Sequence, residues 1–224
     1  MVEFPSNGSS CSGYLAVPAS GSGPGVVVIQ EWWGLVPHIK TVCDRLADDG
    51  FVALAVDLYH GATTTEPDEA GKLAMGMRID QAGRDMGGAV SHLVQHDAVS
   101  GDAVGSVGFC MGGGLSLYLA TLAPAVKACT MYYGVIPWPD CKPQFQNIRG
   151  KVLGHFAEND GSASHAKVDP LERQLKGAGV PTEFHWYAGT QHAFFNDARP
   201  EVYNAEAAQL SYRRTLDFFR AELR

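Results

Sequence analysis

The sequence lacks the features that would place it in a membrane or on nucleic acid. It contains no run of about 18 apolar residues, the length that a membrane-spanning helix needs. Its formal net charge is −7 over 224 residues, so neither nucleic acid nor an anionic membrane is an expected partner. The amino-terminal stretch has neither the basic nor the apolar region of a secretion signal. These absences predict a cytoplasmic protein.

The sequence also has few cysteines, and their spacing is irregular. There are five, an odd number without a Cys-x-x-Cys pair, at positions 11, 43, 110, 129 and 141. The spacing therefore indicates neither a disulfide framework nor a zinc site. Thiols in a cytoplasm are reduced by default, so a free and reactive cysteine is permitted.

What the sequence does contain is a regular alternation of strand and helix signals. Strands are predicted at 25–30, 51–59, 102–109, 126–134, 151–158 and 182–187, and helices at 39–50, 66–96, 111–122, 164–179 and 200–223. Repeated β–α units predict an α/β fold, a mostly parallel, doubly wound sheet with helices on both faces. Because no linker or repeat interrupts them, we expect a single domain over residues 1–224. Ligands of such sheets gather at the carboxyl ends of the strands.

The segment GFCMG at 108–112 has the pattern of a nucleophile elbow, with cysteine in place of serine. It lies between a predicted strand and a predicted helix, as the motif requires, and its glycines suit a turn too sharp for side chains. The helix amino terminus behind Cys110 favours negative charge on the sulfur. Free cysteines are usually buried and inert, but this context favours a nucleophile at Cys110.

An elbow requires an acid and then a histidine later in the chain. His192 follows the strand predicted at 182–187 and is the best candidate for the base. Asp160, in an Asn-Asp-Gly turn after the strand predicted at 151–158, is the preferred acid. Glu158 in the same segment remains an alternative on sequence grounds.

The segment QEWWG at 30–34 ends the first predicted strand. A glutamate is rarely buried without a partner, which suggests that Glu31 enters the active site and controls the protonation of Cys110. The alternative is an anchor for the helix that follows. Elbows take one oxyanion donor from the residue after the nucleophile and one from this early loop. The backbone N–H groups of Met111 and Trp32 would supply them.

These motifs, with DLY at 57–59, AEND at 157–160 and TQHAFF at 190–195, resemble the dienelactone hydrolase (carboxymethylenebutenolidase) family in order and spacing. The resemblance runs from about residue 10 to the carboxyl terminus. It implies an α/β-hydrolase fold and a Cys-Asp-His triad formed by Cys110, Asp160 and His192. It also implies that Glu31 pairs with the resting thiol until substrate displaces it.

The sequence departs from the family at the residues that hold the substrate. The founding enzymes grip a substrate carboxylate with two arginines, one of them four residues past the histidine, where this sequence has Asn196. Arg78 and Arg84 lie in the region of the other arginine but out of register. A related lactone or ester is therefore as plausible a substrate as dienelactone itself.

A cysteine nucleophile has its own consequence for the substrate. Thiolate is a good leaving group, so the tetrahedral intermediate reverts unless the substrate's own leaving group is comparably stable. Enol lactones and activated esters meet this condition, and a thioester acyl-enzyme would follow. The expected partner is a small-molecule ester or lactone, no metal or organic cofactor is needed, and the protein is a monomer or small homo-oligomer. The rival interpretation is a thiol redox sensor or ligand-binding protein on a hydrolase scaffold.

Overall fold

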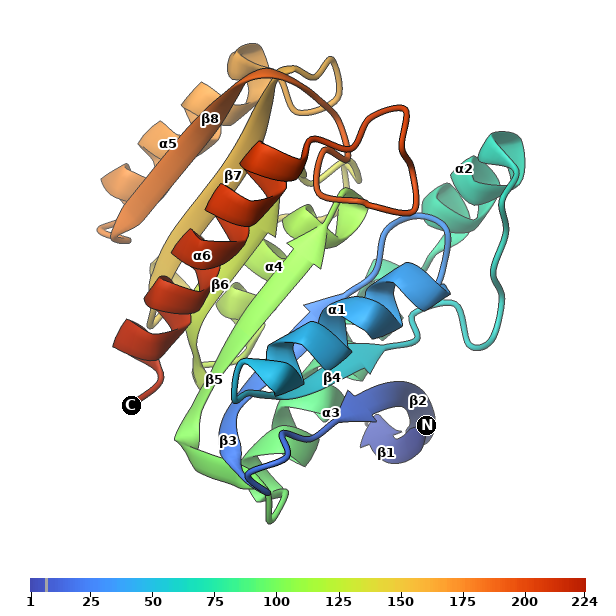
Figure 1. Cartoon of the computed structure of the whole chain (residues 1–224), viewed down its shortest axis with the longest axis vertical. Coiled ribbons are helices and arrows are strands. Elements are labelled where there is room, and N and C mark those ends of the chain that lie inside the picture. The colour runs from blue at the N-terminus through green and yellow to red at the C-terminus, as the bar shows by residue number, and fades with distance from the viewer. Residues whose placement is uncertain (7) are drawn as a thin grey trace.

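The computed structural model describes residues 1–6 and 8–224, whose strands form one sheet (Figure 1). In chain order these are β1 (Val2–Ser6), β2 (Ser9–Ala16), β3 (Gly23–Ile29), β4 (Val52–Val56), β5 (Val99–Phe109), β6 (Val126–Tyr132), β7 (Lys151–Asn159) and β8 (Thr182–Gln191). Their order across the sheet is β1-β2-β4-β3-β5-β6-β7-β8. Strands β3 to β8 pair in parallel, whereas β1 and β2 are antiparallel.

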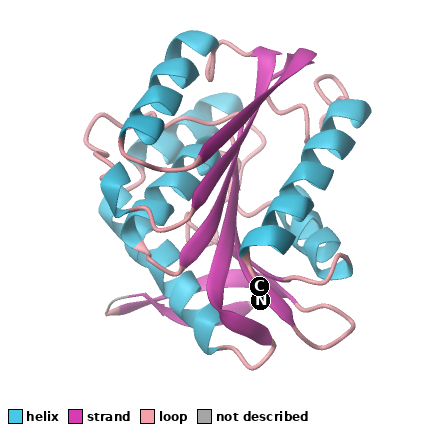
Figure 2. Ribbon diagram, turned by 90° about the vertical axis from the view of Figure 1, so that its left-hand side faces the viewer, coloured by secondary structure: helices cyan, strands magenta, loops and turns pink. Residues whose placement is uncertain are grey.

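Helices cover both faces of this sheet (Figure 2). They are α1 (Pro37–Asp48), α2 (Pro67–Gly76), α3 (Ile79–Gln95), α4 (Met111–Leu122), α5 (His165–Gly177) and α6 (Ala205–Glu222), with a 3-10 turn at Phe145–Asn147. Side chains of α1 and α6 form the core on one face, and those of α3, α4 and α5 form the core on the other. The predicted mostly parallel, doubly wound sheet with helices on both faces is therefore confirmed. No helix within the described residues combines the length and apolar character that crossing a membrane requires.

The central strands are continuous apolar runs because they are buried on both faces. In β3, Val26 and Val28 pack towards α1 and α6, whereas Val27 and Ile29 pack towards α3 and α4. All four side chains are fully buried. This two-sided burial is the reason why the pattern of a parallel strand lacks alternation.

Two predicted helices differ from the observed ones. The segment 66–96, predicted to be largely helical with breaks at its glycines, forms two helices, because the chain is extended at Met77 and Arg78. The helix predicted at 200–223 begins only at Ala205, where the Asn204 side chain accepts a hydrogen bond from the backbone N–H of Ala207. An asparagine cap, and not the preceding proline, sets this start.

Sequence reasoning also missed the hairpin of β1 and β2 and overextended the strand predicted at 51–59, which ends at Val56. The hairpin continues the sheet beyond β4, with β2 antiparallel to that strand. Its residues are mostly small and polar, so the usual strand signal of β-branched and aromatic side chains is weak there.

The strand order reverses between β3 and β5. From β3 the chain passes outward to β4 and then returns to form β5 on the other side of β3. Crossovers leave in opposite directions at such a point, so a crevice opens at the carboxyl ends of the two strands. Glu31 and Cys110 follow these two strand ends.

Candidate active site

Cys110 occupies a strained turn between β5 and α4. Its backbone has φ 57° and ψ −123°, and it is the capping residue before α4. A Cβ on Gly108 would lie 1.8 Å from the carbonyl oxygen of Gly112, and a Cβ on Gly112 would lie 2.5 Å from those of Ile29 and Gln30. Both glycines are therefore needed for the chain to turn so sharply and for α4 to start against the end of β3.

His192 and Asp160 meet at the carboxyl ends of β8 and β7. His192 Nδ1 lies 2.7 Å from Asp160 Oδ2, and the Asp160 side chain is almost fully buried. Asp160 Oδ1 accepts hydrogen bonds from the backbone N–H of Ser162 (2.7 Å) and of Ala163 (3.1 Å). Glu158, the alternative acid, is exposed and instead accepts a hydrogen bond from the N–H of Gly189 at 2.8 Å.

Asp160 and His192 each stabilise the charged form of the other. Burial acts to raise the pKa of Asp160, but hydrogen bonding and charge from His192, with hydrogen bonds from Ser162 and Ala163, lower it to about 2. Burial likewise acts to lower the pKa of His192, but the side chains of Asp160 and Cys110 outweigh it and raise that pKa to about 10. At neutral pH the pair is therefore a carboxylate and an imidazolium, and the imidazolium also interacts with the Cys110 sulfur.

Ser162 is a member of this cluster that sequence reasoning did not identify. Its hydroxyl donates to Asp160 Oδ1 at 2.6 Å and lies 2.9 Å from His192 Nδ1. The available signal was its position two residues after an aspartate in a turn, where such backbone and hydroxyl donors bond the aspartate side chain.

Glu31 is buried beside the elbow, and two side chains hold its carboxylate. Asn196 Nδ2 donates to Oε2 at 2.8 Å, and the hydroxyl of Tyr133 donates to Oε1 at 3.5 Å. The pKa of Tyr133 is raised well above its usual range by burial and then by the charges of Glu31 and Cys110. Asn196, which stands where the founding enzymes have an arginine, is thus a partner of Glu31.

The two expected oxyanion donors lie near Cys110. Met111 is the first residue of α4, so its backbone N–H has no partner within the helix. The backbone N–H of Trp32 makes no backbone hydrogen bond to the described residues. Both residues line the same pocket as Cys110 and His192.

That pocket has a volume of about 680 Å³, with largely apolar walls that include Met75, Ile136 and Pro137. Two cationic side chains, Lys167 and Arg199, also line it. Neither was a sequence candidate, because only the fold brings the first turn of α5, with Lys167, and the loop before α6, with Arg199, to the pocket.

The arginines considered from the sequence lie elsewhere. Arg78 and Arg84 both pair with Asp80, at 2.9 Å and 3.0 Å, and neither lines the pocket that contains Cys110.

Backbone strain is concentrated around the pocket. Among the described residues, the non-glycine residues with positive φ are His60, Cys110, Tyr133 and Ala193. Cys110 and Tyr133 line the pocket, and Ala193 directly follows His192. Such conformations cost about 1–3 kcal/mol each and cluster at functional sites.

Comparison with known proteins gives a consistent relationship. The sequence profile of the dienelactone hydrolase family matches residues 11–223. "Protein usf" of Aquifex pyrophilus is 38% identical over 231 residues, covering 100% of this chain and 98% of that protein. A "Putative carboxymethylenebutenolidase" of Aquifex aeolicus (strain VF5) is 35% identical, with 100% and 99% covered. The crystal structure of a "Putative Dienelactone Hydrolase" from Klebsiella pneumoniae superposes with a TM-score of 0.88 at 27% identity, covering 98% of this chain and 96% of the other.

Proposed function

Because the chain belongs to the dienelactone hydrolase family, whose members hydrolyse ester and lactone bonds, we propose that it cleaves activated esters or enol lactones with Cys110 as nucleophile. The observation that carries this proposal is that His192, whose Nδ1 lies 2.7 Å from Asp160 Oδ2, lines the same pocket as Cys110. Asp160 orients the imidazolium, and the imidazolium stabilises a thiolate at the start of α4.

The first half of the reaction forms a thioester. The Cys110 sulfur attacks the carbonyl carbon, and the carbonyl π electrons move to the oxygen. The N–H groups of Trp32 and Met111 stabilise that oxyanion. As the carbonyl re-forms, the bond to the leaving oxygen breaks, and His192 gives this oxygen its proton.

The second half releases the acid. Neutral His192 removes a proton from water, and the water oxygen attacks the thioester carbon. The carbon–sulfur bond then breaks, which returns the thiolate beside the imidazolium. An enol or phenol leaving group is needed in the first half, because a thiolate departs more readily than an alkoxide does.

Glu31 is proposed to control the protonation of Cys110. A buried carboxylate beside Cys110 gives the proton of the Cys110 thiol a second acceptor besides His192. Asn196 and Tyr133 hold this carboxylate by hydrogen bonds. In Glu31→Gln we expect the pH dependence of kcat/KM to shift relative to wild type, with p-nitrophenyl acetate as substrate. Superimposable profiles would remove Glu31 from the mechanism.

The pocket favours a substrate that carries a negative charge. Arg199 and Lys167 are available at its wall, although Arg199 Nε also pairs with Glu201 (2.8 Å) and Lys167 Nζ donates to the Ser162 carbonyl (2.8 Å). A guanidinium suits a carboxylate because it donates two parallel hydrogen bonds. We therefore propose an ester or lactone with a free carboxylate, held in part by Arg199.

The nucleophile is tested by Cys110→Ala, with Cys141→Ala as the control. Wild type and the control should hydrolyse p-nitrophenyl acetate, whereas Cys110→Ala should lose at least about 10³-fold in kcat. Mass spectrometry of acid-quenched wild type should find an acyl group on Cys110. Activity retained in Cys110→Ala would refute the mechanism. No turnover on a panel of activated esters, with reversible oxidation of Cys110, would favour the redox sensor.

The substrate class is tested by Arg199→Ala, with Arg84→Ala as the matched control outside the pocket. For an enol lactone with a free carboxylate, KM should rise about 10- to 100-fold in Arg199→Ala, since a hydrogen bond to a charged group contributes about 1.5–3 kcal/mol. The corresponding methyl ester should show no such change. An equal effect on both substrates would refute carboxylate recognition by Arg199.

A further inference from the structure

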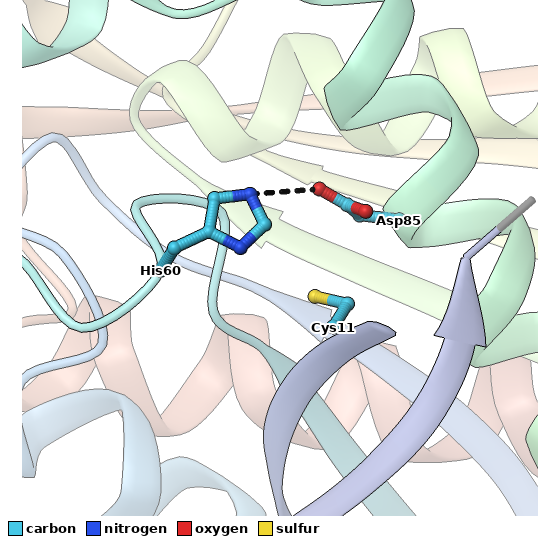
Figure 3. A group of neighbouring side chains, drawn as sticks. All are labelled: Cys11, His60 and Asp85. Atoms are coloured by element: carbon cyan, nitrogen blue, oxygen red, sulfur yellow. Dashed lines mark ion pairs between the residues drawn. The ribbon is translucent and has the colours of Figure 1, made fainter. Parts of the chain in front are cut away.

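Cys11, His60 and Asp85 converge at a point that lies outside the candidate active site (Figure 3). The sulfur, a ring nitrogen and a carboxylate oxygen lie within 4.8 Å of one another. Cys11 belongs to β2, His60 follows β4, and Asp85 belongs to α3, so three separate elements contribute.

Asp85 has one oxygen that is fully used and one that is not. Oδ1 accepts hydrogen bonds from the hydroxyl of Ser6 and from Gln81 Nε2, the latter at 2.8 Å. Oδ2 is buried and has no hydrogen-bond partner among the described residues. His60 Nε2 lies 3.3 Å from Oδ2, as the dashed line in Figure 3 marks, without the alignment of a hydrogen bond. A buried carboxylate oxygen without a donor is costly and points to a missing partner.

The loop before His60 holds this histidine over the carboxylate. Asp57 accepts hydrogen bonds from the N–H groups of Tyr59 (3.3 Å) and Gly61 (2.7 Å), which close the loop. His60 itself has φ 50°, the strained left-handed conformation. Among the described residues, His60 is the only non-glycine residue with positive φ that lies outside the surroundings of the proposed active site. Strain of this kind persists where the surroundings impose a specific side-chain position.

We propose that Cys11, His60 and Asp85 bind a zinc ion, with water as the fourth ligand. Thiolate, imidazole and carboxylate are the donors that zinc prefers, and a tetrahedral ion needs them close together. On binding, the thiol proton leaves to solvent, and the thiolate and carboxylate then balance the two charges of the ion. The hydrogen bonds of Ser6 and Gln81 to Oδ1 would orient the carboxylate so that Oδ2 faces the metal.

The surroundings offer the ion a route to the site. A cavity of about 340 Å³ is lined by both His60 and Asp85, and the His60 side chain is half exposed. Cys11 is only 1% exposed and does not line this cavity, so an ion would reach its sulfur past His60 and Asp85. The ion would clamp the amino-terminal hairpin to α3 and to the loop after β4. Sequence spacing indicated no zinc site because the three donors lie far apart in the chain.

The test compares His60→Asn with His165→Asn. Asparagine tolerates the left-handed backbone of residue 60, and His60 is exposed, so the variant should fold. His165 is a matched control, because it is exposed and its Nδ1 also faces an aspartate oxygen, that of Asp169 at 3.1 Å. Each full-length protein is stripped with a chelator and titrated with Zn²⁺, and with Co²⁺ as a spectroscopic probe.

Wild type and His165→Asn should bind one Zn²⁺ per chain, and their Co²⁺ forms should show sulfur-to-cobalt charge-transfer absorption. His60→Asn should lose both signals, and Gln81→Ala should bind Zn²⁺ about 10- to 100-fold more weakly. Absence of stoichiometric binding in wild type would refute the proposal. Equal binding by all variants would also refute it, because another cluster such as Cys110 with His192 would then hold the ion.

Discussion

Replacing Asp160 by asparagine tests the charge arrangement of the candidate active site directly. The change keeps the size of the side chain, and an amide oxygen could still accept the N–H groups of Ser162 and Ala163. It removes the negative charge that lies 2.7 Å from His192 Nδ1. Any loss in Asp160→Asn therefore reports on charge and proton position more than on packing.

The expected loss of stability follows from the pKa of Asp160. In the folded protein His192 and the local hydrogen bonds hold it at about 2, below the ordinary value of 3.8. At about 1.4 kcal/mol for each pH unit, this difference corresponds to about 2 to 3 kcal/mol of folding free energy above pH 4. Because the folded value is the lower one, this contribution is lost as the pH falls from 4 through 2. Asp160→Asn should be less stable by about this amount at pH 5–6.

The pKa of His192 sets the behaviour at higher pH. Its folded value is raised from 6.5 to about 10, so its contribution to stability is complete below pH 6.5 and is lost as the pH rises towards 10. As the pH rises from 6.5 to 8, the free energy of unfolding of wild type should fall because of this group, with a slope that steepens towards about 1.4 kcal/mol per pH unit. The slope should be smaller in Asp160→Asn, because the pKa of His192 in this variant should lie closer to the ordinary value.

Activity should fall for a related reason. An asparagine Nδ2 that faces His192 Nδ1 would favour the tautomer with the ring proton on Nε2. Nε2 is the nitrogen that must act as the base, and it cannot accept a proton in that tautomer. The same substitution in a serine triad lowers kcat by about 10⁴-fold, so we expect a loss of about 10²- to 10⁴-fold with p-nitrophenyl acetate.

Asp169→Asn is the matched control, because Asp169 also faces a histidine but is exposed. Its stability and activity should equal those of wild type, since exposed ion pairs contribute little. The assays are urea unfolding at pH 5, 6, 7 and 8 and initial rates at the same pH values. Parallel stability curves for wild type and Asp160→Asn, or unchanged kcat, would refute the assignment of Asp160.

Two further predictions concern packing and buried polar groups. Gly87→Ala in α3 should raise the free energy of unfolding by up to about 1 kcal/mol, since nothing lies within 4 Å of the added methyl group. Gly88→Ala should lower it, because that methyl group would lie 2.3 Å from the carbonyl oxygen of Pro5; equal urea midpoints for the two variants would contradict this. Asn196→Ala should cost about 1–3 kcal/mol in urea unfolding by removing the 2.8 Å donor of buried Glu31, and an unchanged midpoint would mean that Tyr133 alone satisfies the carboxylate.

The parts of the fold that could be predicted are those whose signals are local. Strand β5, the glycine turn and α4 were predicted from adjacent residues, because the turn itself requires Gly108 and Gly112. The hairpin of β1 and β2 was missed, since its stability comes from pairing with β4 and from packing on α3 and not from its own composition. The glycines of the segment 66–96 indicated breaks in the helix but not that it ends at Gly76, because partly buried Met77 and Ile79 beyond it pack on the core only in the folded chain.

The same distinction applies to the site. Cys110, Asp160 and His192 each follow a strand end, so their approach could be anticipated from topology alone. Asp160 rather than Glu158 faces His192 for a reason of register: Glu158 lies within β7, exposed, whereas Asp160 follows the strand and turns inward. Arg199 and Lys167 could not be found from the sequence, because Arg199 lies in an irregular loop and Lys167 in the first turn of α5, and only the fold brings both to the pocket.

The role of Asn196 could be anticipated from the sequence only in part. The sequence identified it only as a missing arginine, which left the recognition of a substrate carboxylate without a residue. In the structure its amide satisfies Glu31, while Arg199, three residues further along the same loop, lines the pocket. An arginine at position 196 would be drawn into an ion pair with the buried glutamate, whereas an amide binds that carboxylate without adding charge. The two tasks, holding Glu31 and meeting an anionic substrate, can therefore be divided between neighbouring residues, which makes Arg199 the position at which substrate choice should be most open to change.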